Sequence, residues 1–190
     1  MLRAFKEQLK YLSQVSDEVV IKKINIHSHR EDGVSLVKPV RNLILVMPDL
    51  IEQIRAWSND SDIPVEEKKL NGFVLTYLYH PVDFLPEAEY GFFGYLDDAY
   101  MVGKIFARMT ARLQVKQVKM TDNILDISRN INDWLEKVRQ VIPEEVKKID
   151  ALIDDLSQGH LESFDRLISQ EGGGYELNQT RQEEIKSSAI

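Results

Sequence analysis

The segment from Pro81 to Asp98 reads PVDFLPEAEYGFFGYLDD and lies between two apolar stretches with helical spacing. Proline has no backbone N–H, and the residue before a proline is pushed away from helical angles. The helix before this segment must therefore end by His80, and a new helix is expected to start between Gly94 and Asp97. The pattern predicts two helices joined by a turn that contains prolines, and the rest of the fold must pack around this hairpin.

Apolar residues recur three and four positions apart through most of the remaining chain, which is typical of amphipathic helices. We therefore expect an all-α helical bundle of six to eight helices with the proline hairpin at its centre. The segments with this spacing run over residues 2–12, 39–59, 64–80, 94–113, 122–138, 143–156 and 161–168.

Three places leave alternatives open. Residues 18–37 are rich in β-branched side chains, so a short β-hairpin competes with a helix there, although the helical neighbours favour a helix in the first half. Pro48 either kinks a helix from Pro39 to Asn59 or opens a second helix at its first position. Pro143 either separates two helices or kinks one, and Gly159 is expected to cap the C-terminal end.

These segments suggest four regions. They are an N-terminal helical region (1–38), a helical hairpin domain (39–120), amphipathic helices packed on it (121–170) and a disordered tail (171–190). The tail opens with Gly172, Gly173 and Gly174 and holds few apolar side chains, so little burial offsets the entropy lost on ordering it.

Composition excludes several classes of function. The chain has 190 residues and no cysteine, so thiol nucleophiles, thiolate metal sites and disulfides are excluded. A net charge of −7 disfavours binding to nucleic acid and to anionic membrane surfaces. The N-terminus lacks the pattern of a signal peptide, and no uncharged run reaches the ~20 residues of a transmembrane helix, so a cytoplasmic protein is expected.

The proline segment resembles the YkvA-like family, a domain of unknown function (DUF 1232), over roughly residues 48–110. That family shows a pattern close to Pro-x-Asp-x-Ile-Pro-Asp before its turn and Gly-Tyr-x-Asp-Asp after it. The matching residues here are Pro81, Asp83, Pro86, Gly94, Tyr95, Asp97 and Asp98. Glu87 stands where the family has its second aspartate, and a later proline is missing. The resemblance implies a helix, turn and helix arrangement and no particular reaction.

The carboxylates of this segment allow two interpretations. Asp83, Asp97 and Asp98 could converge on a hard cation such as Mg²⁺ or Mn²⁺, which would make the protein a metal-dependent enzyme, for example a hydrolase. The favoured interpretation is structural: Asp83 organises the turn, and Asp97 or Asp98 stabilises the positive end of the following helix. Adjacent residues on a helix point about 100° apart, so Asp97 and Asp98 rarely bind the same ion.

Two further features are candidate partner surfaces. Phe92 and Phe93 are either core residues or an exposed contact patch. Lys104, Arg108 and Arg112 lie on one helical face, continued by Lys116 and Lys119, and such a stripe usually pairs with acids elsewhere in the protein. We expect a non-enzymatic interaction or regulatory module, with no cofactor, that binds another protein or itself. The pair His27 and His29 has no carboxylate at metal-ligand spacing and is interpreted as a polar segment.

Overall fold

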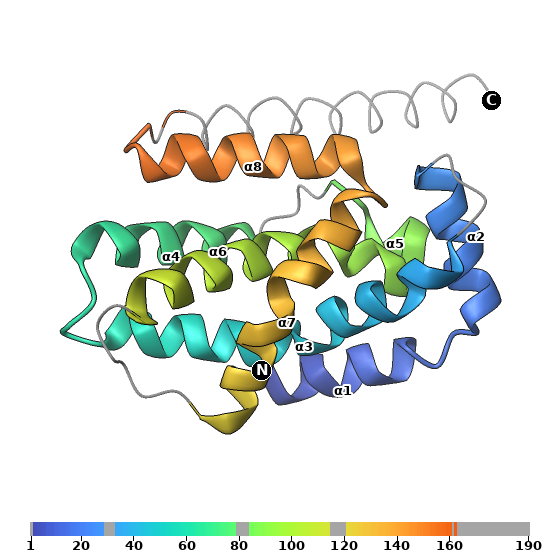
Figure 1. Ribbon diagram of the computed structural model, residues 1–190, viewed down its shortest axis with the longest axis horizontal. Coiled ribbons are helices and arrows are strands. Elements are labelled where there is room, and N and C mark those ends of the chain that lie inside the picture. Colours follow the sequence, from blue (N-terminus) through green and yellow to red (C-terminus); the bar gives the residue numbers. More distant parts are fainter. Residues whose placement is uncertain (1, 29–32, 79–83, 115–120, 161, 163–190) are drawn as a thin grey trace, which may run out of the picture.

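The computed structural model describes residues 2–28, 33–78, 84–114, 121–160 and 162. Within these residues the chain forms eight α-helices, one 3-10 helix and no strand. Figure 1 shows how the helices are arranged. The all-α fold class predicted from the sequence is confirmed. The elements are α1 (Leu2–Leu12), α2 (Asp17–Ser28), α3 (Val34–Asn59), α4 (Val65–Tyr77), α5 (Glu87–Tyr90), η1 (Gly91–Tyr95), α6 (Leu96–Gln114), α7 (Asp122–Arg139) and α8 (Pro143–Ser157).

Helix α3 lies at the centre of the bundle and contacts α1, α2, α4, α6 and α7 (Figure 1). Helices surround it because apolar residues occupy more than one of its faces, as expected for a helix buried in the interior. Its fully buried side chains include Leu43, Ile44, Met47, Leu50 and Ile54.

Helix α3 differs from the sequence-based expectations in two ways. It begins at Val34 and continues through both Pro39 and Pro48, so the alternative in which Pro48 opens a second helix is wrong. Each proline removes one backbone hydrogen bond, and packing on several sides keeps the helix continuous in spite of that loss. The helix also crosses the boundary that the sequence predicted between residues 38 and 39.

The β-hairpin considered for residues 18–37 is also wrong, because α2 covers the first half of that range and α3 covers its end. Val20 and Ile24 are four residues apart, and both are buried. Burial of this helical stripe outweighs the β-propensity of the branched side chains, which depends strongly on context. The preference for a helix in the first half is confirmed.

Helix α1 is attached to the bundle mainly by partly buried side chains. Leu9 is its one buried residue, while Leu2, Phe5 and Leu12 pack against the core with part of their surface exposed. Lys6 forms an ion pair with Asp49 of α3 at 2.6 Å, with the lysine side chain more than half exposed. An exposed pair of this kind contributes little to stability.

Thr121 caps the start of α7, and the cap expected at Gly159 is present at the end of α8. Thr121 caps α7 by accepting a hydrogen bond from the backbone N–H of Ile124 at 3.4 Å. Gly159 adopts a φ of +87°, and the N–H of His160 donates to the carbonyl of Asp155 at 3.0 Å, as in a Schellman cap. The short helix expected at residues 161–168 and the tail at 171–190 lie outside the described residues, apart from Glu162.

Pro143 separates two helices, which settles the alternative left open by the sequence. Helix α7 ends at Arg139, and α8 begins at Pro143 itself, the first helical position that proline favours. The connecting residues Val141 and Ile142 are fully buried, so the connection belongs to the core.

Gly103 in α6 lies where three helices meet. A Cβ atom at this position would lie 3.1 Å from a methyl carbon of Leu43 in α3 and 3.1 Å from one of Leu135 in α7. The absence of a side chain at Gly103 therefore lets α6 approach both neighbours closely.

No helix in the described part of the chain combines the length and the apolar character needed to cross a lipid bilayer. The cytoplasmic location expected from the sequence stays a prediction.

Candidate functional site: the turn pocket

Asp97, the second residue of α6, ties this helix to the preceding turn. It is fully buried, and its Oδ2 accepts a hydrogen bond from the backbone N–H of Phe84 at 3.1 Å. The bond therefore fixes the residue that directly follows Asp83. Asp83 and Pro81 lie outside the described residues, so their expected roles in the turn stay predictions.

Gly94 allows the turn to pack closely on itself. A Cβ atom there would lie 2.7 Å from the Cα of Glu87 and 2.9 Å from the carbonyl oxygen of Leu85. Pro86 precedes α5, and its carbonyl accepts hydrogen bonds from the N–H groups of Glu89 and Tyr90, each at 3.0 Å. Gly94 and Pro86 therefore both take part in the close packing of this turn.

Phe92 and Phe93 lie in 3-10 helix η1 and are only 5% and 3% exposed. Their rings belong to the hydrophobic core cluster, which is the first of the two interpretations drawn from the sequence. His27 of α2 stacks on Phe93 with 5.0 Å between ring centroids, so this histidine packs against the turn. His29 lies outside the described residues.

A small pocket opens beside this turn, and we call it the turn pocket. It has a volume of about 180 Å³. Its walls come from α1, α3, the C-terminal end of α4, α5, η1 and α6, so it unites residues far apart in the sequence. The lining residues are Leu2, Phe5, Ile51, Leu78, Glu87, Tyr95 and Asp98.

The two aspartates at the start of α6 lie in different environments. Asp97 bonds the amide of Phe84 in the interior, whereas half-buried Asp98 lines the turn pocket. This divergence agrees with the angle between adjacent helical residues. No group of three or more His, Asp or Glu side chains within the described ranges is arranged to hold a metal ion. A metal set that includes Asp83 stays a prediction.

The basic stripe of α6 pairs with carboxylates of neighbouring helices. Lys104 lies 3.1 Å from Asp150 of α8, and Arg108 lies 3.7 Å from Glu67 of α4. Arg112 forms an ion pair with the same Glu67, which is buried. Lys116 and Lys119 lie outside the described residues. The stripe thus joins α6 to α4 and α8, and its role as a partner surface stays a prediction.

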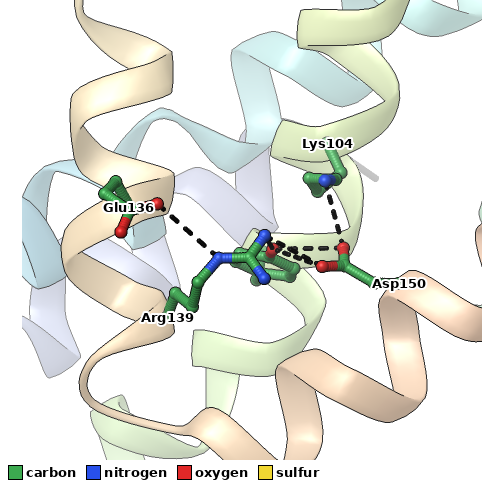
Figure 2. A network of polar contacts seen from close by, with 5 residues as sticks. Lys104, Glu136, Arg139 and Asp150 are labelled. Carbon is green, nitrogen blue, oxygen red and sulfur yellow. Dashed lines mark hydrogen bonds and ion pairs between the residues drawn. The ribbon is translucent and has the colours of Figure 1, made fainter.

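Asp150 is the centre of a polar network that joins three helices, shown in Figure 2. Its carboxylate accepts a hydrogen bond from the hydroxyl of Tyr100 at 3.1 Å, and Arg139 Nη2 donates to it at 2.9 Å. Arg139 Nη2 also donates a hydrogen bond to the Tyr100 hydroxyl oxygen at 3.0 Å, and Arg139 Nε forms an ion pair with Glu136 at 3.6 Å. We call Tyr100, Lys104, Glu136, Arg139 and Asp150 the Asp150 network.

The surroundings of Tyr100 keep its hydroxyl protonated. Burial raises the pKa of Tyr100 well above its usual value, and the negative charge of Asp150 raises it further. The hydroxyl is therefore a hydrogen-bond donor at neutral pH, which fits a structural link between α6 and α8.

Sequence reasoning missed both the turn pocket and the Asp150 network. Tyr100 and Asp150 are 50 positions apart, and Leu2 is still further from Asp98. The one signal available was the basic stripe, which indicated that acidic partners lie elsewhere in the chain.

The geometry defines a helical domain packed around α3, with a turn that buries Phe92, Phe93 and Tyr95 and has a pocket beside it. Residues 67–103 match the model of a family described as "Protein of unknown function (DUF1232)". This match lies inside the range 48–110 and confirms the resemblance predicted from the sequence, and the YkvA-like name is compatible with it. Comparisons with curated proteins and with solved structures found no match.

Proposed function

We propose that this protein is a non-enzymatic interaction module and that the turn pocket is where another protein docks. The observation that carries the proposal is the pocket itself, which lies at the family segment and is walled mainly by apolar side chains. Leu78, Glu87, Tyr95 and Asp98 come from that segment, and α1 and α3 complete the pocket. A small apolar recess of this kind suits an anchoring side chain of a protein partner.

The lining favours binding over catalysis. An enzyme that acts on a polar substrate needs several polar groups to orient it, whereas four of the seven described residues that line the pocket are Leu, Ile or Phe. The hydroxyl of Tyr95 already accepts a hydrogen bond from Gln8 Nε2 at 3.1 Å. The metal-dependent enzyme considered from the sequence is less well supported, because Asp97 is engaged by the amide of Phe84.

The net charge favours a different protein over a second copy as the partner. Two copies of this chain each carry a net charge of −7 and repel each other, whereas a basic protein is attracted. The proposal therefore concerns a heterologous complex.

Site-specific photo-crosslinking in the host cell tests this proposal. A benzophenone amino acid replaces Leu78 in the pocket wall, directly after α4, and a matched control replaces Val65, an exposed apolar residue at the start of α4. We expect one defined protein to be crosslinked from position 78 and not from position 65. The purified partner should bind the wild-type chain and bind poorly to Leu2→Trp, which fills the pocket. Equal crosslinking from both positions, or a crosslinked dimer of this chain, would contradict the proposal.

A further inference from the structure

The size of the turn pocket limits its occupant to about one side chain. A dry cavity of about 150 Å³ is known to hold benzene, so about 180 Å³ accommodates one long side chain and not a helix or a large cofactor. Because the pocket is partly open to solvent, a side chain presented by another molecule can enter it. The occupant is therefore a single anchoring group.

The walls of the pocket suit a long apolar stem. Leu2 and Phe5 of α1, Ile51 of α3 and Leu78 at the end of α4 present aliphatic and aromatic surface. Phe5 packs edge-on against Tyr95 with 5.8 Å between ring centroids, and this contact positions both rings. Burying methylene groups against such walls is favourable, because it removes apolar surface from water.

The polar groups of the pocket suit a cation. Glu87 and Asp98 are half-buried and line the pocket, and none of the described residues that line it is a lysine, arginine or histidine. A carboxylate offers about four acceptor positions, so a carboxylate that already has one partner can accept another hydrogen bond. Phe5 and Tyr95 also line the pocket, and aromatic rings attract cations through their π faces.

A metal ion fits this lining poorly. Mg²⁺ and Ca²⁺ need about six or more oxygen ligands, whereas the described residues of the lining offer two carboxylates and one phenol among apolar side chains. An organic cation on an aliphatic stem satisfies both parts of the pocket at once. Among protein side chains, lysine and arginine have this form.

We infer that the turn pocket binds a lysine or arginine side chain of the protein partner, with the stem against Leu2, Ile51 and Leu78 and the charged group beside Glu87 and Asp98. This inference rests on the proposed function and adds the chemistry that the partner must present. A basic side chain is also the group that the net charge of −7 attracts most strongly.

Titration with small probes tests the inference without the partner. Nα-acetyl-lysine methylamide is compared with Nα-acetyl-norleucine methylamide, which has the same stem without the charge, and with MgCl₂. Methyl NMR signals of Leu2, Ile51 and Leu78 report on the pocket. We expect the lysine probe to shift these signals saturably and to bind about tenfold more tightly than the norleucine probe. MgCl₂ should leave them unchanged.

Charge-removing variants identify the carboxylates. The double variant Glu87→Gln and Asp98→Asn keeps the shapes and should weaken lysine binding about tenfold. Glu89→Gln changes an exposed carboxylate of α5 outside the pocket and should bind as the wild type does. If the double variant does not fold, the two probes on the wild type decide the question alone.

Equal binding of the two probes to the wild type would overturn the inference, and so would lysine binding that survives the double substitution. The crosslinking experiment at position 78 is read separately, since it needs no assumption about the charge of the anchoring group. A specific crosslink together with failed lysine binding would therefore reject the basic anchor and keep the docking site.

Discussion

Replacement of Asp150 by asparagine measures what the Asp150 network contributes to stability. Asparagine keeps the shape of the side chain and one acceptor oxygen, but it loses the charge that pairs with Lys104 and Arg139. Both cations have side chains about one third to one half exposed, so each lost ion pair costs only about 0.2–1 kcal/mol. The hydrogen bond from the buried Tyr100 hydroxyl is worth more, since bonds to charged groups contribute about 1.5–3 kcal/mol.

Asparagine retains part of that hydrogen bond, so we expect Asp150→Asn to lower the free energy of unfolding by about 1–3 kcal/mol. In a chain of this size this corresponds to a fall in the thermal midpoint of roughly 2–12 °C. Urea unfolding at pH 7, followed by circular dichroism at low and high salt, measures the change. The decrease in the free energy of unfolding should be smaller at high salt, because exposed ion pairs are screened.

Asp154→Asn is the matched control, because this aspartate is exposed on the same helix and makes none of the contacts of the network. Its effect should stay within about 0.5 kcal/mol. If Asp150→Asn and Asp154→Asn gave the same small change, the network would contribute no stability, and the reasoning from its distances would be refuted.

Tyr100→Phe should reduce the fall in the free energy of unfolding above about pH 10. The pKa of Tyr100 is raised in the folded protein, so just above this pH only the unfolded wild type releases the proton. Parallel curves of unfolding free energy against pH for the wild type and the variant would argue against this reasoning. Gly94→Ala should destabilise the fold by about 1–3 kcal/mol or more, because the added methyl meets backbone atoms; an unchanged urea midpoint would show that the turn can shift. Saturating Mg²⁺ or Mn²⁺ should leave the thermal midpoint unchanged, and a rise that disappears in Asp98→Asn would instead support a metal site. Truncation after Glu171 should also leave the midpoint nearly unchanged, and a fall of about ten degrees or more would mean that the tail contributes to the fold.

The elements with local signals were predictable from the sequence. Thr121, Pro143 and Gly159 each act through the backbone of their own helix, so they mark helix ends whatever the rest of the chain does. Short helix α5 was missed because tertiary contact helps to set it: the turn closes on itself only where Gly94 approaches Leu85 and Glu87. The start of α3 was missed for a similar reason, since its first turns are stabilised by packing in the core.

The candidate site was less predictable than the fold. The sequence identified Asp98 as a residue of interest, but the turn pocket exists only because α1 lies beside the ends of α4 and α6. Helical periodicity tells which face of a helix is buried and does not tell which helix covers it. Ion pairs between distant helices, such as that of Lys104 with Asp150, depend on the same unknown order of packing.

The weak attachment of α1 has a consequence for the turn pocket. Helix α6 is fixed at Gly103 between α3 and α7, and α3 is surrounded by other helices, so the walls that they supply are rigid. Helix α1 supplies Leu2 and Phe5 but has one fully buried anchor, Leu9, located near its other end. Local displacement costs least where few apolar contacts are lost. We therefore expect the first turns of α1 to be the adjustable wall that sets how long a side chain the pocket admits.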